Sequence, residues 1–290
     1  MLLPDPYDDV LEQLYLLHPR SVLRELAVLR RQGEELVAGL GGLNITPHHG
    51  GIFGAYRHRP LFNETSLRVT GESGNHINPD ILYLQAWNEA DILFLDRFLR
   101  MVHVLHHQLH RRQGGLIVDV HPRHIGSLPG DHGKVFGRLL QRVGLTPSAV
   151  ILRLAAAPLL AEGHVQKAAR SFIRHGYRIL AEAVPQEPEA LSRLASIGVH
   201  WVSPDLDIKH PGARRRRLRL WLQQAHRTGL LSLAPASTTQ LAQEGFRQMG
   251  FLLTRTPSAP LQDAITPVPM TRVGNMVPAS AEDNPPSWLL

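Results

Sequence analysis

Residues 60–69 read PLFNETSLRV, and this is the stretch that decides the fold. Leu61 and Phe62 begin an apolar strand, and Glu64 follows inside it. A carboxylate this close to the apolar part of a strand is uncommon, because a buried charge is costly unless it is paired or used. Several later strands also end in a polar or charged residue, which is how a (β/α)₈ barrel presents its functional site. The stretch therefore predicts a barrel strand that carries a site residue.

From Gly50 onward, short apolar runs alternate with amphipathic helical stretches. We expect strands at 51–56, 60–69, 115–120, 149–155, 177–184, 200–205, 230–235 and 250–254. We expect helices at about 79–112, 131–143, 158–175, 188–197, 212–228 and 238–249. Runs of Val, Ile and Leu between helices indicate a parallel sheet buried on both faces, and about eight such strands indicate a closed α/β barrel. An open doubly wound sheet is the alternative, although no Gly-rich phosphate loop follows any of the strands.

The two ends of the chain differ from this central pattern. Residues 8–40 are predicted to be helical, with Ser21 capping a second helix that ends before Gly41-Gly42. After Arg255 the chain is rich in proline and small polar residues, which is typical of a disordered tail. We therefore expect an N-terminal helical segment at 1–44, a barrel at 45–256 and a flexible tail at 257–290.

Composition limits the classes of protein to consider. Of the 290 residues, 43% are hydrophobic and none is cysteine, which excludes disulfides and thiolate metal sites. The N-terminus lacks the basic flank of a signal peptide and no window suits a membrane span, so we expect a cytoplasmic protein. The formal net charge of +6 comes without interleaved aromatic residues. A nucleic-acid partner is therefore not expected.

The order of several short motifs resembles that of the EAL domain, the bacterial phosphodiesterase of cyclic di-GMP, over roughly residues 45–256. Glu64-Thr65-Ser66-Leu67-Arg68 stands where that family has Glu-Ala-Leu-Leu-Arg. Further matches, to the family's linker and final helix, are Asn78-Pro79, Ile81, Ala90, Leu95-Asp96-Arg97, Ser237, Gln240-Leu241 and Gly250. The resemblance implies a TIM-like barrel of EAL type.

The residues that this family uses for chemistry are only partly retained. The resemblance makes Glu64 the counterpart of a metal-ligand Glu and Arg68 that of the Arg that contacts the substrate phosphate. It places Asp119 at a metal-ligand Asn, and it places Arg153 where a second metal-ligand Glu would stand.

Further along the chain the catalytic motifs are lost. The family's Asp-Asp-Phe-Gly falls on Ala181-Glu182-Ala183-Val184, and its Glu-Gly-Val-Glu falls on Leu233-Ala234-Pro235-Ala236. Ser203 replaces the general-base Lys, whereas Asp205 is kept, and the closing Gln lies near Leu252. The resemblance thus implies a pocket whose remaining members are Glu64, Arg68, Asp119, Arg153, Glu182 and Asp205.

Arg153 argues against metal-dependent hydrolysis. Mg²⁺ needs near-octahedral oxygen ligands, and two-metal hydrolysis needs several carboxylates. At about 4 Å and an effective dielectric near 20, a cation–cation contact costs on the order of 4 kcal/mol per pair of unit charges. We therefore expect no metal, no cofactor and no phosphodiesterase activity. The alternative of a hydrolase with a rebuilt site would use Glu64, Asp119, Glu182 and Asp205.

Arg153 also has a structural interpretation. The remaining carboxylates would converge at one end of the barrel and repel one another without a counter-ion. The hypothesis is that Arg153 pairs bidentately with two of them and stands in for the lost ion. The alternative is that Arg153 points away from this end.

Other polar groups suggest sites less strongly. His103, His106, His107 and His110 include pairs spaced i,i+4 that suit zinc, but a polar face of a scaffold helix is the favoured interpretation. His121 and His124 follow a strand and fit an ordinary loop, and residues 131–134 fit a helix N-terminus.

Two segments are candidates for binding a partner. The first is the cationic start of a helix, formed by Arg214, Arg215, Arg216, Arg217 and Arg219. Cations there oppose the helix dipole, which hints at an acidic partner, although a solvated face is the favoured interpretation. The second is Trp288 with the final leucines, for which an incidental frayed end is favoured.

Together these patterns favour an inactive EAL-like domain that acts as a regulatory protein-interaction module in bacterial signalling. A non-hydrolysing receptor of cyclic di-GMP is the alternative, since Arg68 is kept but most other matching positions are not. The identity of the protein partner does not follow from the sequence.

Overall fold

The computed structural model describes residues 6–32, 35–54, 59–110, 112–128, 130–205, 211–236 and 240–256. The predicted tail at 257–290, including Trp288, lies outside the described residues. The strands are β1 (Ala27–Gln32), β2 (Glu35–Leu40), β3 (Leu43–Gly54), β4 (Phe62–Thr70), β5 (His76–Ile77), β6 (Gly115–Asp119), β7 (Val150–Ala155), β8 (Arg178–Val184), β9 (Trp201–Pro204), β10 (Leu231–Ser232) and β11 (Leu253–Arg255). The helices are α1 (Pro6–Leu17), α2 (Ile81–Leu84), α3 (Glu89–Leu109), α4 (Pro122–Gly126), α5 (Lys134–Arg142), α6 (Ala156–Ala161), α7 (Gly163–Arg174), α8 (Pro188–Ile197), α9 (Pro211–Arg227) and α10 (Gln240–Met249), with 3₁₀ turns at Leu23–Glu25 and Pro147–Ala149.

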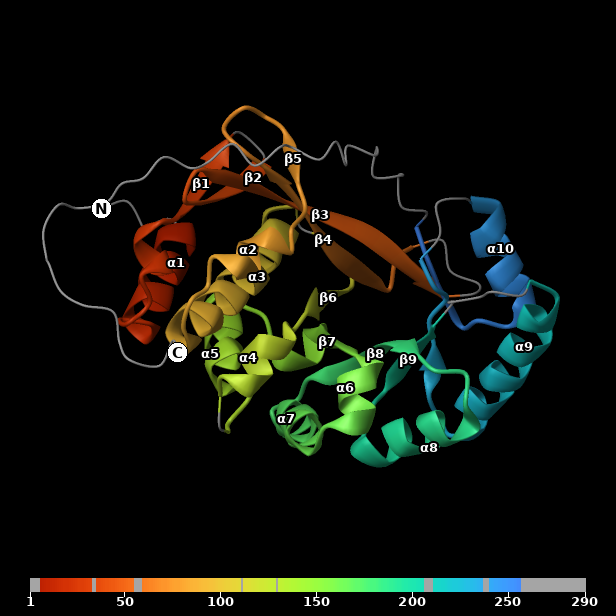
Figure 1. Ribbon diagram of the computed structural model, residues 1–290. Coiled ribbons are helices and arrows are strands. Elements are labelled where there is room, and N and C mark those ends of the chain that lie inside the picture. The colour runs from red at the N-terminus through yellow and green to blue at the C-terminus, as the bar shows by residue number, and fades with distance from the viewer. Residues whose placement is uncertain are drawn as a thin grey trace, which may run out of the picture. The chain divides into compact units, whose positions relative to one another are not determined.

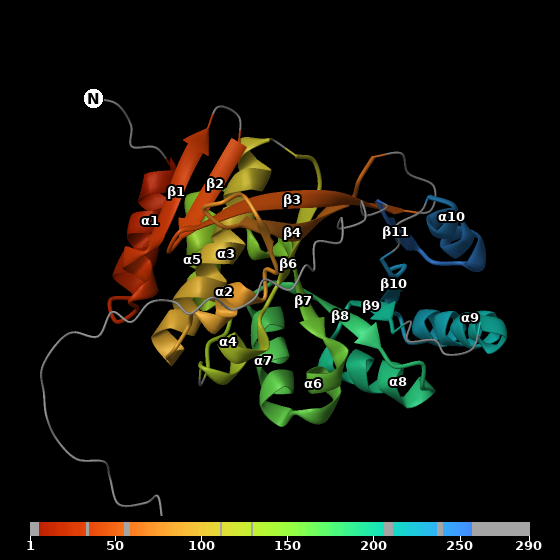
Figure 2. The same cartoon turned by 45° about the horizontal axis from the view of Figure 1, so that its top comes forward.

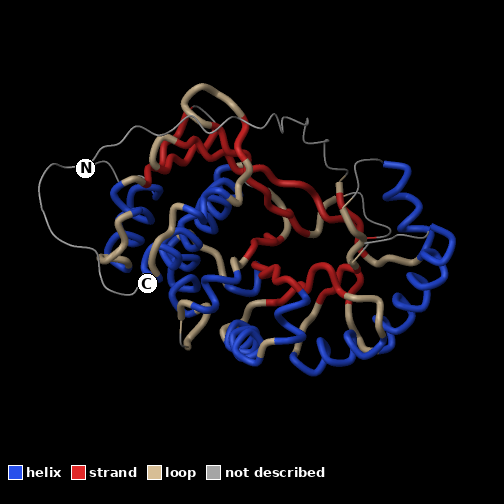
Figure 3. Tube along the Cα trace, in the orientation of Figure 1, coloured by secondary structure: helices blue, strands red, loops and turns tan. Residues whose placement is uncertain are grey.

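The predicted α/β barrel is confirmed. Its strands follow the order β3, β4, β6, β7, β8, β9, β10, and β11 pairs with β3. A parallel bridge between Leu233, just after β10, and Leu253 of β11 completes the ring. Helices lie outside the part of this ring formed by β6 to β10 (Figure 1, Figure 3). Each predicted barrel strand overlaps an observed one, although β10 is shorter than predicted and β11 lies slightly later in the chain, and α8 has the predicted bounds.

One strand of the barrel does not run in the expected direction. The strands from β4 through β6 to β10 pair in parallel, but β3 is antiparallel to both β4 and β11. The reason is the short connection: β3 ends at Gly54 and β4 begins at Phe62. A parallel crossover needs a dozen or more residues, so these two strands form a hairpin.

The prediction of helix over residues 8–40 holds only for α1, and the rest is wrong. Residues 27–32 and 35–40 form the antiparallel strands β1 and β2, which extend β3 into a sheet beside α1 (Figure 2). In β2, Leu36, Ala38 and Leu40 are buried and alternate with more exposed residues, which is the period of a strand. Gly41 and Gly42 are not a helix end but a two-residue hairpin turn between Leu40 and Leu43. Their φ angles of 53° and 81° suit a turn in which both central residues are left-handed.

The barrel interior is a separate apolar cluster. Nearly every strand contributes one inward side chain to it; they are Ile52, Phe62, Ile117, Ile151, Leu180, Trp201, Leu233 and Leu253. The rings of Phe62 and Trp201 meet edge to face with centroids 4.7 Å apart. Because successive side chains alternate between faces, the residues two positions further along these strands also point inward, at one end of the barrel. That end, where β6, β7 and β11 finish, is called the mouth below.

Among the described residues, we find no helix with both the length and the apolarity to cross a bilayer.

Candidate functional site

The inward positions above the apolar layer carry charges. Glu64 lies two residues after Phe62, Asp119 two after Ile117, and Arg153 two after Ile151. Glu182 and Arg255 stand in the same relation to Leu180 and Leu253. The parallel strands β6 and β7 align Asp119 directly with Arg153. These five residues, Glu64, Asp119, Arg153, Glu182 and Arg255, are called the mouth cluster.

Within the mouth cluster, acidic and basic groups alternate. Arg153 forms a bidentate pair with Asp119, in which Nη2 donates to Oδ2 at 2.7 Å and Nε donates to Oδ1. Its Nη1 donates to Oε1 of Glu64, and its Nη2 also faces the carbonyl oxygen of Thr65 at 3.4 Å. The structure thus brings Arg153 between two of the carboxylates named from the sequence, and does not point it away from them.

A second arginine continues the chain of ion pairs. Nε of Arg255 lies 3.5 Å from Oε2 of Glu64, and its Nη2 donates to Oε2 of Glu182 at 2.7 Å. The ion pairs therefore connect the five side chains in the order Asp119, Arg153, Glu64, Arg255, Glu182. Sequence reasoning missed Arg255, although a signal was present: it follows the inward Leu253 by two residues in the last strand.

Electrostatics favour these pairs. Burial alone would lower the pKa of the Arg153 guanidinium, but the charges of Asp119, Glu64 and Glu182 and the hydrogen bond with Asp119 raise it overall. Arg255 is only 6% exposed, whereas the carboxylate of Asp119 is 60% exposed and remains in contact with water. With three carboxylates and two guanidinium groups, the cluster has a formal charge of −1. A bidentate guanidinium–carboxylate pair is among the stronger ionic contacts in proteins.

The two remaining pocket residues named from the sequence are Arg68 and Asp205. The guanidinium of Arg68 is exposed and contacts the ring of His76 at 2.7 Å, so the contacts of this side chain lead away from the mouth cluster. Asp205 follows the end of β9, where Ser203 occupies the inward position. The backbone N–H of Asp205 donates to Val184 at 2.8 Å.

The carboxylates do not fit a divalent ion as they stand. Five of the six oxygens of Glu64, Asp119 and Glu182 are engaged by the two arginines. A hard cation needs several of these oxygens at once, in near-octahedral geometry for Mg²⁺. Within the described part of the chain, no group of three or more His, Asp or Glu side chains is arranged to hold a metal ion.

The histidines of α3 lie in the interior. His103, His106 and His107 are buried and surround the ring of His49 on β3, with the centroids of His49 and His106 4.5 Å apart. Burial lowers the pKa of His103 to about 3 and that of His106 to about 4. This segment therefore contributes neutral imidazole rings packed together, so the histidine face of the scaffold helix is buried and not solvated.

The remaining predicted segments form ordinary local structure. His121 caps α4 by accepting a hydrogen bond from the backbone of Arg123 at 3.2 Å, and His124 is buried beside Asp96. Helix α5 begins at Lys134, as the residues before it indicated. On α9, Arg215, Arg216, Arg217 and Arg219 are exposed, while the side chain of Arg214 lies outside the described residues.

The fold and the position of the mouth define a mixed α/β barrel of the EAL type. The FimX EAL domain from Pseudomonas aeruginosa, solved bound to c-di-GMP, matches with a TM-score of 0.62 and 13% sequence identity, over 73% of this chain and 87% of that one. The FimX EAL domain of Xanthomonas citri, also in complex with c-diGMP, matches with a TM-score of 0.57 and 13% identity, over 86% and 92% of the two chains. The PaMucR phosphodiesterase in its c-di-GMP complex matches with a TM-score of 0.56 and 14% identity, over 73% and 93%.

No protein-family model and no curated protein matches this chain. The similarity to EAL domains is thus a similarity of fold.

Proposed function

We propose that this chain is a catalytically inactive EAL-like domain that acts as a regulatory protein-interaction module in bacterial signalling, in the cytoplasm. The observation that carries the proposal is the mouth cluster, in which Arg153 and Arg255 form ion pairs with the carboxylates. A guanidinium supplies positive charge but cannot activate a water molecule as a bound metal ion does. The cluster therefore supports the shape of the barrel and leaves no place for metal-assisted hydrolysis.

An exposed apolar surface supports the second half of the proposal. Trp87 is 86% exposed and Leu84 is 74% exposed, and Ile81 lies three residues before Leu84 on the same side of α2. Large apolar side chains gathered on a surface commonly mark a protein interface, and Trp is frequent among residues that dominate binding energy. These three residues are called the α2 surface.

The backbone beneath the α2 surface is held in place. The guanidinium of Arg123 donates to the carbonyl oxygens of Tyr83 at 2.7 Å and Ala86 at 2.8 Å. Asn88 caps α3 immediately afterwards by accepting from the backbone of Asp91 at 2.9 Å. Leu84 and Trp87 are thus presented by fixed backbone, which lowers the entropic cost of binding.

A second candidate function is a receptor that binds cyclic di-GMP without cleaving it. It is favoured by the solved structures of similar fold that contain this dinucleotide. Against it, Arg68, the one retained counterpart of a phosphate-contacting residue, is directed to His76. An active hydrolase with a rebuilt site is the third candidate.

Calorimetry and turnover separate these candidates. With cyclic di-GMP, in the presence and absence of Mg²⁺, we expect no binding in the micromolar range, and with Mn²⁺ and a generic bis-phosphodiester we expect no turnover. An active EAL phosphodiesterase serves as the positive control in both assays. Micromolar binding without turnover would favour the receptor, and turnover above background would contradict the proposal of an inactive domain.

The partner surface is tested by comparing variants in one pull-down. We expect Leu84→Ser/Trp87→Ser to lose a specific partner while its stability stays within about 0.5 kcal/mol of wild type, because exposed side chains add little to folding. The matched comparisons are Arg215→Ala/Arg216→Ala/Arg217→Ala on α9 and a chain ending at Thr256. If the partner is lost only in the α9 variant or only in the shortened chain, the α2 surface is not the binding site.

A further inference from the structure

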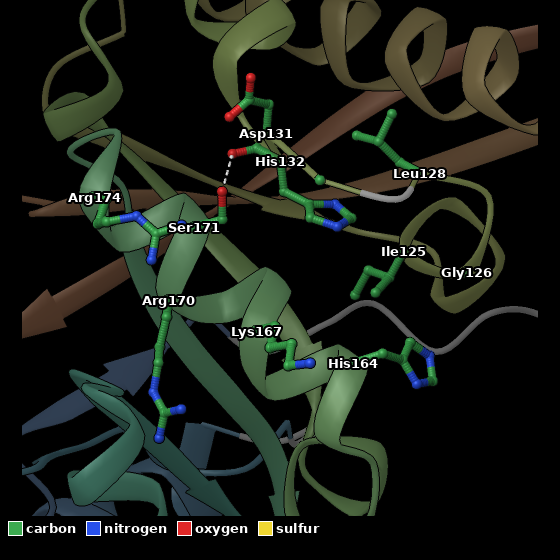
Figure 4. Close-up of a pocket in the computed structure, with 11 residues that line it drawn as sticks. Ile125, Gly126, Leu128, Asp131, His132, His164, Lys167, Arg170, Ser171 and Arg174 are labelled. Carbon is green, nitrogen blue, oxygen red and sulfur yellow. Dashed lines mark hydrogen bonds between the residues drawn. The ribbon is translucent and has the colours of Figure 1, made fainter.

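A second candidate site lies on the outside of the barrel. An open pocket of about 770 Å³ is bounded on one side by α4 and the segment that follows it, and on the other by α7. Its lining residues include Ile125, Leu128, His132, Lys167, Arg170 and Arg174 (Figure 4). None of the residues that line it belongs to the mouth cluster. Its size falls within the range of pockets that hold small molecules, about 300–1,000 Å³.

One wall of the pocket is a row of cations. Lys167, Arg170 and Arg174 are spaced i, i+3 and i+7 on α7, with His164 one turn before them, so they share one face of that helix. All three cations are exposed, and among the described residues no hydrogen bond or ion pair joins any of them to an acidic group. The one carboxylate in the pocket lining, Asp131, lies 3.6 Å from Lys134 instead.

This row is unfavourable for the isolated helix. Like charges three or four residues apart destabilise a helix by about 0.2–0.5 kcal/mol per pair. On a solvated helix face, acidic and basic residues more often alternate. A row of cations without acidic partners beside a pocket therefore indicates a site for an anion. Figure 4 shows Lys167 directed toward His164 near the start of α7 and Arg174 at the far end of the helix, with Arg170 between them and extended away from His132, so the positive charge is spread along α7. An anion that matches this spread must carry more than one charge.

The opposite wall is rigid. The carbonyl oxygen of His132 accepts from Ser171 Oγ at 3.3 Å, and that of Gly133 accepts from the Tyr177 hydroxyl at 3.0 Å. Gly133 has a φ of 92°, and a Cβ there would lie 2.7 Å from the Tyr177 ring, so only glycine fits. The ring of His132 is 95% buried in this wall, and its Nδ1 has no hydrogen-bond partner among the described residues. The wall is therefore preformed.

We infer that this pocket binds a small ligand that carries two or more phosphate groups. Guanidinium groups pair with phosphate oxygens bidentately, and lysine adds a point charge that phosphates also accept. A single phosphate would reach only part of the row, whereas a di- or triphosphate spans successive turns of α7. Because the pocket is open and its cations are solvated, binding weakens as ionic strength rises. This site is independent of the mouth cluster, so it does not rest on the proposed function.

The test is calorimetry of the full chain with inorganic triphosphate, ATP and inorganic phosphate at low and high salt. We expect one triphosphate or ATP per chain with a dissociation constant below about 1 mM, and much weaker binding of inorganic phosphate. In Arg170→Glu/Arg174→Glu, affinity is expected to fall by about 10-fold for each charge-assisted hydrogen bond that the substitutions remove. A second variant, Lys167→Ala, removes one cation with little risk to folding and is expected to bind about 10-fold more weakly.

The control changes the net charge equally at another place. Arg20 and Arg30 are exposed and lie outside α7, so Arg20→Glu/Arg30→Glu carries the same charge change without touching the pocket. This control is expected to bind triphosphate like wild type. Equal reductions of affinity in both double variants would show a non-specific response to net charge and overturn the inference. Binding that survives unchanged in the Arg170/Arg174 variant, or no binding of triphosphate or ATP at low salt, would overturn it as well.

Discussion

Arg153→Ala is expected to lower the free energy of unfolding by about 3 kcal/mol, because removing one member of a largely buried ion pair leaves its partners uncompensated. Arg153 bonds both oxygens of Asp119 and one oxygen of Glu64. Asp119 is well exposed and can be rehydrated, so most of the cost falls on Glu64, which would keep only Arg255. Denaturant unfolding monitored by circular dichroism measures the difference.

The matched control is Arg68→Ala. Arg68 lies on the same strand as Glu64, but its guanidinium is exposed and contacts only His76. Its removal is expected to change stability by no more than about 0.5 kcal/mol. Arg153→Lys should fall between the two, since an ammonium cannot make the bidentate pair. If Arg153→Ala is as stable as wild type, the ion pairs of the mouth cluster do not stabilise the barrel.

The same position tests whether the guanidinium stands in for an ion. Arg153→Glu changes the formal charge of the mouth cluster from −1 to −3, because one positive charge is exchanged for one negative charge. Four carboxylates with Arg255 as their only counter-charge within the cluster repel one another. We expect this variant to lose thermal stability and to recover part of it with Mn²⁺, whereas the wild-type chain gains nothing. A variant that neither loses stability nor binds Mn²⁺ would refute the stand-in hypothesis.

Acidification is expected to unfold this protein near pH 5. Burial lowers the pKa of His18, His103 and His124 from 6.5 to about 3 each. For His124, burial is the largest cause; the charge of Asp96 opposes it, and the nearby Arg100 and Arg97 add to it. All three rings are therefore neutral in the folded chain at neutral pH.

The sign of the effect follows from proton uptake. Below about pH 6.5 these histidines bind protons in the unfolded chain, whereas in the folded chain they stay neutral until the pH nears their lowered pKa of about 3. The free energy of unfolding therefore decreases as the pH falls through this window. Each histidine contributes about 1.4 kcal/mol per pH unit, or together on the order of 6 kcal/mol between pH 6.5 and 5. That is comparable with the whole stability of a typical domain, about 5–15 kcal/mol.

A single substitution checks the origin of this pH dependence. His103→Gln removes one titrating ring, so the slope of unfolding free energy against pH should decrease by about 1.4 kcal/mol per pH unit. Leu84→Gln, at an exposed position without a titrating side chain, is expected to leave the slope unchanged. Equal slopes in wild type and His103→Gln would show that the buried ring is protonated without cost.

Much of the barrel follows from local sequence. Apolar runs, several of them preceded by glycine, predicted β4 and the strands from β6 to β11 but not β5, and α8 was placed at its exact bounds. Glu64 was noticed from its place in an apolar strand, whereas Asp119 and Arg153 were named from the resemblance to the EAL domain; in the structure all three lie two positions beyond an inward apolar residue. These features depend only on neighbours along the chain.

The N-terminal residues show where such reasoning fails. Leu and Val recur in residues 22–40 at spacings that fit either a helix or a strand, so periodicity could not decide between them. What decides is the partner: β2 pairs with β3, and its buried face meets α3. The antiparallel direction of β3 likewise depends on its hairpin with β4 and on the closure with β11.

By itself, then, the sequence determined which segments become the barrel strands and which charges they carry to the mouth. Only the tertiary structure decided how those charges pair, because Arg153 and Glu64 are 89 residues apart and Arg255 and Glu182 are 73 apart. It also decided that α3 buries its histidines and that three cations on α7 face a pocket formed with another segment. Contacts between distant segments depend on how the ring of strands closes, and no local pattern of residues encodes that closure.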